Sequence, residues 1–281
     1  EAATTRIQYD QNGNKVKEID GNGNGKYYFY DALGNQTAKV DALGYVTTQS
    51  FDAAGNRTQV YQYASQGSSL ETLPGAALGE RITSTITNAE LLGSGYLNIT
   101  TNSDDRITDY DYNQLNQLSE ERIKNVELAD VDTQGNLSDV IADKVTTFDY
   151  DNNGKQTQES VFAQDDSQAI IGNIQTTDFA FDALGRQISE TSPEFTAEIN
   201  SDHDTGTVRA TTSYHYDALG NQVVQIQEGL TGTIGVIDAT DRTSKSLFDA
   251  AGNKVQDINA LGHTVNYGVD ANGNTVYQDW T

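Results

Sequence analysis

The chain has 281 residues, of which 17 are Lys or Arg and 41 are Asp or Glu, giving a formal net charge of −24. An acidic surface repels phosphate backbones and anionic lipid heads, which excludes nucleic acid and bare membranes as expected partners. The absence of cysteine excludes disulfides and thiolate metal sites, and no apolar run reaches the roughly 18 residues of a membrane span, so we expect no membrane insertion.

The first 61 residues repeat one short pattern about every ten positions. An Asp is followed three residues later by a Gly in "YDALGN", "VDALGY" and "FDAAGN". Asp at the first position of a turn accepts hydrogen bonds from backbone N–H groups two residues on, and Gly at the fourth position adopts the left-handed conformation. The pattern therefore predicts a 21-residue unit of two strand-plus-turn halves, anchored in this region at Asp10, Asp20, Asp31, Asp41 and Asp52.

The residues between these turns have the composition of β-strands. Segments such as "NQTAKV" and "YVTTQSF" are rich in Thr, Val, Gln and Tyr and contain no proline. Every second turn follows an aromatic residue, as in Tyr30-Asp31 and Phe51-Asp52, except the last, which follows Val269. A type I turn, a left-handed Gly and a bulge form a common hairpin connection, so we expect consecutive antiparallel hairpins.

Residues 62–247 continue the pattern with extra length at the turns that lack the aromatic residue. We place one aromatic anchor at Tyr110-Asp111, although Tyr-Asn-Gln follows it, and we read residues 113–131 as a long strand leading to a turn at 132–136. Insertions confined to one border mark a contact face in many repeat proteins, or are simply tolerated there; both interpretations stay open. The five insertions are Leu70–Leu97, Val126–Val140, Phe162–Ile174, Ser192–Val208 and Gln227–Lys245.

Residues 248–281 return to the regular spacing, with anchors at Asp249, Asn259 and Asp270. The fold we predict is all-β, a single repeat domain over residues 1–281 with regular repeats at 9–61 and 248–281 and extended repeats at 62–247. Its structural turn anchors are Asp10, Asp31, Asp52, Asp151, Asp182, Asp217, Asp249 and Asp270, with Gly13, Gly34, Gly55, Gly154, Gly185, Gly220, Gly252 and Gly273.

This repeat pattern of an aromatic residue, Asp and Gly resembles the YD or RHS repeat, most clearly in "YDALGNQTAKVDALGYVTTQSFDAAGNRT" and "FDAAGNKVQDINALGHTVNYGVDANGN". In that family, spiralling β-sheets wind into hollow shells. The shells of bacterial RHS toxins and of the C components of insecticidal toxin complexes enclose a toxic C-terminal segment, and those of teneurins serve cell adhesion. The resemblance implies a wall element of such a shell, secreted or at the cell surface.

The segment "DGNGNGKYYFYD" has the spacing of a calcium loop. Asp20, Asn22, Asn24 and Asp31 supply oxygen ligands, which suit a hard cation. The same aspartates also belong to two ordinary turns, and that alternative requires no ion. Calcium is therefore the one cofactor that the sequence suggests, beside the alternative of no cofactor.

The sequence offers no residue with a clear catalytic role, and we expect that the chain is not an enzyme. No Ser stands in a Gly-x-Ser-x-Gly elbow, and the three His residues lie in different repeats. The many carboxylates leave a carbohydrate-cleaving pair open as an alternative. Glycans are possible partners if the faces of Tyr27, Tyr28, Tyr30, Tyr61 and Tyr63 stack on sugars instead of on neighbouring strands.

The leading functional hypothesis is a structural, non-catalytic segment of an extracellular shell that encloses or carries a toxin. The alternative is an adhesive or filament-forming scaffold, because the first and last strands of such a sheet present unpaired backbone edges. The sequence begins in mid-pattern and contains no Met. We therefore expect its partners to be the remainder of a longer parent chain or further copies of itself, with toxin as possible cargo.

Overall fold

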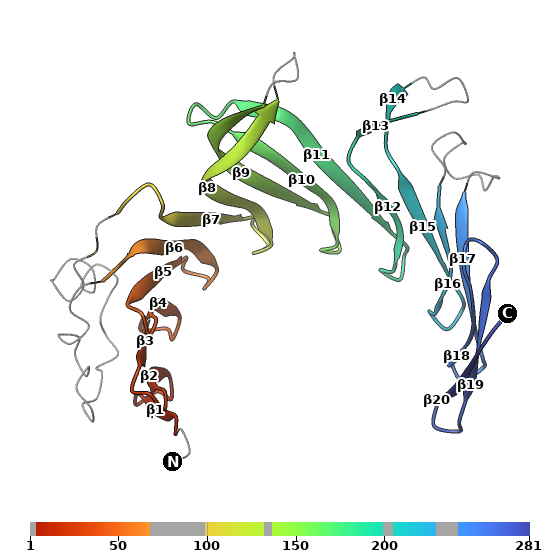
Figure 1. Cartoon of the computed structure of the whole chain (residues 1–281), viewed down its shortest axis with the longest axis horizontal. Helices are drawn as coiled ribbons and strands as arrows, with labels where there is room; N and C mark the ends of the chain where they lie inside the picture. The colour runs from red at the N-terminus through yellow and green to blue at the C-terminus, as the bar shows by residue number, and fades with distance from the viewer. Residues whose placement is uncertain (1–3, 68–98, 100, 132–136, 199–204, 229–240) are drawn as a thin grey trace. The chain divides into compact units, whose positions relative to one another are not determined.

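The computed structural model describes residues 4–67, 99, 101–131, 137–198, 205–228 and 241–281. The all-β prediction is confirmed: an open, 18-stranded antiparallel sheet and a two-stranded sheet account for the strands, and no helix occurs among these residues. Figure 1 shows strands that follow one another in sequence order, joined by turns at alternate ends. The predicted turn at 132–136 and the insertion at 70–97 lie outside the described residues.

Two compact units make up the chain, the first formed by Glu1–Thr147 with Phe162–Asn173 and the second by Phe148–Val161 with Ile174–Thr281. The single repeat domain stays a prediction. The first unit contains β1 (Arg6–Tyr9), β2 (Lys15–Ile19), β3 (Gly25–Tyr30), β4 (Gln36–Val40), β5 (Tyr45–Phe51), β6 (Arg57–Gln66), β7 (Arg106–Tyr112) and β8 (Leu118–Val131).

Three strands contribute residues to both units: β9 (Leu137–Tyr150), β10 (Gln156–Gln164) and β11 (Ile170–Phe181). The second unit continues with β12 (Gln187–Thr191), β13 (Phe195–Glu198), β14 (Thr205–Val208), β15 (Thr211–Tyr216), β16 (Gln222–Gln227), β17 (Arg242–Phe248), β18 (Lys254–Ile258), β19 (Thr264–Val269) and β20 (Thr275–Trp280). Of the long strand predicted at residues 113–131, residues 118–131 form β8, whereas residues 113–117 form a turn because the Asn113 N–H donates to the Gln117 carbonyl oxygen. The insertion at 192–208 contains the hairpin β13–β14.

A β-bulge accompanies the turns that follow an aromatic residue. In β3–β4 the register shifts between Phe29 and Tyr30, because Tyr30 pairs with Gln36 while Phe29 pairs with Ala38. The hairpins β1–β2, β5–β6, β7–β8, β11–β12, β15–β16 and β17–β18 shift at the equivalent place. The hairpin β19–β20 shifts there too, although Val269 stands in place of the aromatic residue. By contrast β2–β3, β4–β5 and β18–β19 keep an unbroken register. The two borders of the sheet therefore differ in backbone geometry, since a bulge bends and twists its strand.

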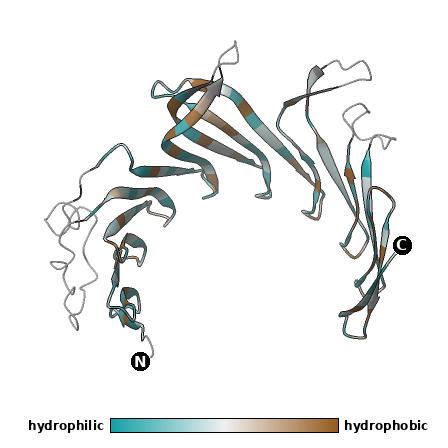
Figure 2. Cartoon of the chain, viewed as in Figure 1, coloured by the Kyte–Doolittle hydropathy of each residue, from teal (hydrophilic) through white to brown (hydrophobic). Residues whose placement is uncertain are grey.

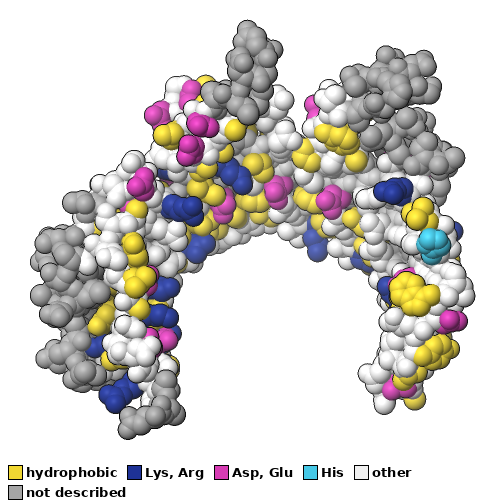
Figure 3. All heavy atoms as spheres, viewed as in Figure 1, with side chains coloured by type: hydrophobic (Ala, Val, Ile, Leu, Met, Phe, Trp, Pro, Cys, Tyr) yellow, Lys and Arg dark blue, Asp and Glu magenta, His cyan; other side chains and the backbone are white. Residues whose placement is uncertain are grey.

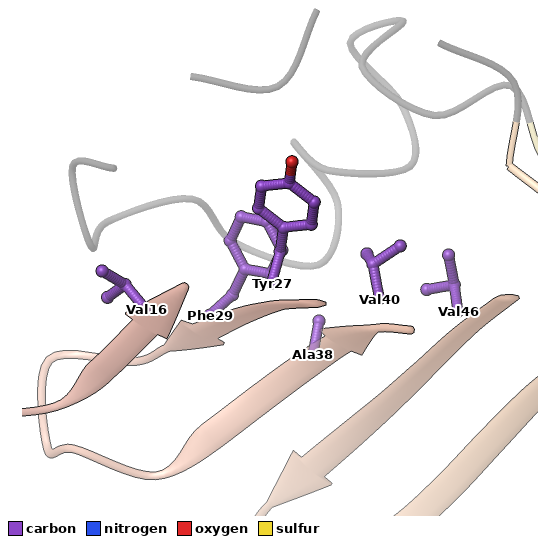
Figure 4. Packing of buried hydrophobic residues seen from close by; sticks show 6 residues of the cluster. All are labelled: Val16, Tyr27, Phe29, Ala38, Val40 and Val46. Atoms are coloured by element: carbon purple, nitrogen blue, oxygen red, sulfur yellow. The ribbon is translucent and has the colours of Figure 1, made fainter. Parts of the chain in front are cut away.

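The hydrophobic core lies in the first unit. Figure 4 shows six side chains gathered on one side of the strands, those of Val16, Tyr27, Phe29, Ala38, Val40 and Val46. Tyr30, Tyr63 and Ile99 pack against this cluster. Burying a large apolar side chain contributes about 1.5–3 kcal/mol, so these strands form the best-packed part of the unit.

The second unit is a thinner structure. Ile226 is its one buried hydrophobic residue among those described, and every residue of β20 is exposed. Figure 2 shows hydrophilic and hydrophobic residues interleaved along the strands, and Figure 3 shows acidic, basic and apolar side chains interspersed on the visible face of each unit. Backbone pairing between neighbouring strands, rather than a central core, therefore holds this unit together.

Candidate functional site

The repeated structure of this chain is a five-residue turn, and Asp31–Asn35 represents it. The Asp31 N–H donates to the carbonyl oxygen of Asn35 at 2.9 Å, and the Gly34 N–H donates to the carbonyl oxygen of Asp31 at 3.1 Å. Oδ1 of Asp31 accepts from the N–H groups of Leu33 and Asn35, and Oδ2 accepts from Nδ2 of Asn35 at 2.9 Å. Both carboxylate oxygens are thus engaged within the turn.

These hydrogen bonds favour the ionised carboxylate. The side-chain hydrogen bond from the following Asn is the largest cause that lowers the pKa of Asp20, Asp52, Asp217, Asp249 and Asp270. For Asp10 and Asp31, burial acts in the opposite direction as the largest single effect, yet the combined hydrogen bonds still lower the pKa.

The fourth position of the turn has a positive φ throughout the described sheet. Eleven glycines there have φ between 76° and 92°, among them the eight predicted anchor glycines, while Gly135 lies outside the described residues. A side chain with Cβ is disfavoured in this region. Two turns nevertheless place another residue there, Asn116 with φ of 59° and Gln168 with φ of 66°.

The predicted anchor at Asp111 is wrong. Asp111 lies within β7, and the turn begins two residues later, where Asn113 N–H donates to the carbonyl oxygen of Gln117 at 2.9 Å. Asn113 Oδ1 accepts from the N–H groups of Leu115 and Gln117, as an anchor Asp does. The aromatic residue of this repeat is therefore Tyr112, and Asn residues replace both the Asp and the Gly of the pattern.

Tyrosines at the aromatic position link successive turns on the same border. The Tyr30 hydroxyl donates to the carbonyl oxygen of Lys15 at 2.9 Å, and Lys15 is the first residue after the preceding turn of the same kind. The equivalent bond joins Tyr112 to Arg57 at 3.0 Å and Tyr216 to Gln187 at 2.7 Å. A residue of one repeat thus fixes the position of the repeat before it.

Arg186 adds a second link in the second unit. Its guanidinium pairs with the Asp182 carboxylate at 2.6 Å, donates to the carbonyl oxygen of Asp217 at 3.3 Å and lies 4.7 Å from the centre of the Tyr216 ring. In the first unit, Asn56 Nδ2 donates to Asn116 Oδ1 at 3.1 Å. The fifth residue of a turn therefore contacts the next turn along the same border.

The predicted calcium ligands are divided between two turns. Asp20, Asn22 and Asn24 belong to the β2–β3 turn, whereas Asp31 begins the β3–β4 turn at the other end of β3. Six extended residues span roughly 20 Å, so one ion does not reach both aspartates. No group of three His, Asp or Glu residues suited to a metal occurs in the described part of the chain. The structure brings Asp20 and Asn24 together through hydrogen bonds, without Asp31.

The five tyrosines considered for glycan binding contact the protein itself. Tyr27 and Tyr28 are buried, and Tyr30 donates to the backbone. Tyr61 stacks with Tyr63 at 4.3 Å between ring centres. These contacts favour the packing alternative, and glycan binding by the five tyrosines stays a prediction.

A buried carboxylate escaped the sequence interpretation. Asp105, only 6% exposed, accepts hydrogen bonds from the Tyr61 hydroxyl and from the N–H groups of Ala64 and Asn102. The pKa of Tyr61 is raised to about 12, first by burial and second by the hydrogen bond from its hydroxyl to Asp105. Asn102 begins a tight turn that positions Asp105, and the run "TNSDD" was the available signal for it.

Comparison with known proteins gives a family match for part of the chain. Residues 30–66 match the family model of the RHS repeat. No curated protein matches the sequence.

Similar solved structures include TcdB2-TccC3-Cdc42 and TcdB2-TccC3, each with a TM-score of 0.46 and 14% identity over 99% of this chain. The Tc holotoxin pore of Photorhabdus luminescens has a TM-score of 0.20 and 10% identity over the same share. The chain spans 13%, 14% and 18% of those chains, respectively. At these values the similarity supports no conclusion about function.

Proposed function

We propose, from the RHS repeat at residues 30–66, that this chain is a structural, non-catalytic segment of an extracellular protein whose β-sheet forms part of a wall enclosing or carrying a toxin. The single observation that supports the proposal most strongly is the recurrence of one turn through the described sheet. Thirteen turns share the two backbone bonds seen at Asp31. The wall is extended by adding hairpins, and its partners are the rest of a parent chain and the toxin cargo.

The chemistry of the carboxylates supports a structural role. The anchor aspartates accept hydrogen bonds from their own turns, and Asp105 is enclosed by three donors. A catalytic acid or base needs a free position facing a substrate.

Among the described residues there is no helix with the length and hydropathy that a membrane span requires.

Electron microscopy of the intact protein that contains this chain tests the proposal. A continuous wall of β-strands around internal density would support it. A protein without an enclosed space, or an open groove containing a pair of carboxylates that cleaves glycosides, would overturn it.

A second candidate, assembly through strand edges, is favoured by β20. This strand pairs with β19 on one side, and its apolar residues are largely exposed: Val276 at 61%, Tyr277 at 62% and Trp280 at 73%. An exposed apolar edge strand without Lys or Pro invites another strand.

Sedimentation velocity over a range of concentrations tests this second candidate. Edge pairing predicts that the sedimentation coefficient rises with protein concentration. This rise should disappear in Val276→Lys and persist in Val255→Lys, which places the same charge on an internal strand. A monomer at every concentration would remove the idea.

Calcium binding also stays a prediction, and chelation tests it. If turn carboxylates hold calcium, removing the ion exposes them to mutual repulsion, and the melting temperature falls by several degrees; we expect the fall to be reversed by added calcium but not by magnesium. An identical melting temperature before and after chelation would show that the turns need no ion.

A further inference from the structure

The second unit contains a hollow of about 710 Å³ on one face of the sheet. Four residues of its lining form a row across adjacent strands, because His215 pairs with Val224, Val224 with Lys245, and Lys245 with Ile258. Directly opposed residues project from the same face of an antiparallel sheet. Ile226 lies on this face as well, and the turn that begins at Asn259 closes one end.

The floor of the hollow is apolar, and Lys245 is the one charged residue in its described lining. Val224, Ile226 and Ile258 supply the apolar floor, and His215 and Lys245 project beside it. Among the described residues that line the hollow, none is Asp or Glu, although acidic residues outnumber basic ones by 41 to 17 in the chain. The hollow therefore differs in charge from the surrounding surface.

Lys245 has no carboxylate partner within the described part of the chain. Lys15, Lys124 and Lys254 each pair with a carboxylate at 2.8–3.1 Å. The Lys245 side chain is exposed, and among the described residues it makes neither an ion pair nor a hydrogen bond. The ammonium offers its charge to an anion, and the apolar floor beside it offers a surface to an alkyl chain.

We propose that this hollow binds a small amphipathic carboxylate, a ligand class that goes beyond the proposed structural function. The alkyl chain lies against Val224, Ile226 and Ile258, and the carboxylate faces the Lys245 ammonium, with His215 as a further donor. The volume falls within the roughly 300–1,000 Å³ range of ligand pockets. A ligand with an alkyl chain and no charge, or with a charge and no chain, satisfies only half of the site.

Titration calorimetry of the whole chain with decanoate, below the concentration at which it forms micelles, tests the proposal. We expect saturable binding of decanoate, weaker binding of decanol, and no detectable binding of acetate or decyltrimethylammonium. Equal binding of decanoate and decanol would overturn the proposal, because the charge would then contribute nothing. Binding to fatty-acid-containing vesicles without binding of free decanoate would overturn it too.

The matched variants are Lys245→Gln and Lys254→Gln. An exposed ion pair is worth up to about 1 kcal/mol, so Lys245→Gln should weaken decanoate binding about threefold to fivefold while leaving decanol binding unchanged. Lys254→Gln removes the same charge outside the hollow, where Lys254 pairs with Asp257, and should leave both affinities unchanged. Equal losses in the two variants, with urea midpoints confirming that both are folded, would show that only net charge matters.

Discussion

Most turn aspartates are half-buried, and their ionisation is coupled to folding. The hydrogen bond from the Asn221 side chain, opposed by burial and assisted by backbone N–H groups, lowers the pKa of Asp217 from its usual 3.8. The folded state therefore binds a proton less readily than the unfolded state. This contribution to stability is complete above the unfolded pKa and is lost as the pH falls through the lowered folded value. Because the same turn recurs, we expect stability to fall steeply in acid.

Asp217→Asn tests this coupling at one turn. The chain itself uses Asn in this position at Asn113 and Asn259, where Oδ1 still accepts the backbone N–H groups. We expect a small loss of stability at pH 7 and a shallower decline below about pH 4, measured as the urea midpoint of unfolding. Asp166→Asn, at an exposed carboxylate without a hydrogen bond among the described residues, should leave the acid decline unchanged. Identical profiles for the two variants would contradict the coupling.

Tyr216→Phe isolates the bond between neighbouring repeats. The variant removes a 2.7 Å hydrogen bond to the Gln187 carbonyl oxygen and keeps the ring, as Phe181 and Phe248 do naturally at the same position. The expected loss is about 1 kcal/mol in the free energy of unfolding, measured by urea denaturation. Tyr9→Phe is the control, because the Tyr9 side chain is exposed and makes no hydrogen bond among the described residues. Equal costs for both variants would exclude the inter-repeat bond as the cause.

At the scale of the strand, the bulge and the cross-strand pairs decide which side chains meet. The final hairpin pairs Gly268 with Tyr277, and the register shifts one step later, between Gly268 and Val269. The Tyr277 ring occupies the space above Gly268, so that a Cβ added to the glycine would meet a ring carbon. An aromatic residue opposite a strand glycine covers backbone that would otherwise face water.

Gly268→Ala should therefore destabilise the β19–β20 hairpin by about 1–3 kcal/mol, measured by urea denaturation, because the ring must move or the strands must separate. The cost has a specific origin that a double variant reveals. In the Tyr277→Ala background the ring is gone, and the same Gly268→Ala change should cost much less. If Gly268→Ala costs as much with the ring as without it, the contact between Gly268 and Tyr277 is not the cause.

At the scale of the molecule, the two units distribute their stability unevenly. The buried cluster around Phe29 belongs to β2–β5 of the first unit, while β20 of the second unit is exposed along its whole length. In a repeat-built sheet, stability is a sum over neighbouring strands rather than a property of one core. Strands with few buried contacts open more readily than strands with many.

Native-state hydrogen exchange measures this difference directly. We expect the slowest-exchanging amides in β3 and β4, and the fastest strand amides in β20, with opening free energies separated by several kcal/mol. Phe29→Ala should cost about 3–5 kcal/mol and accelerate exchange across β2–β5. Uniform protection from β2 to β20 would show instead that the whole sheet opens as one cooperative unit.

The turns, their alternation and the all-β fold were predictable from the sequence, because each turn is closed by residues at most four positions apart, as Asp31 and Asn35 are. The residues that meet across repeats became visible only in the folded sheet. Tyr216 bonds a carbonyl 29 positions away, and Tyr61 bonds a carboxylate 44 positions away. The structure also shows that one turn begins at Asn113 instead of Asp111, with Asn113 and Asn116 in place of the expected Asp and Gly. Local hydrogen bonds are encoded by neighbouring residues, whereas contacts between strands depend on a register that the paired backbone sets as a whole.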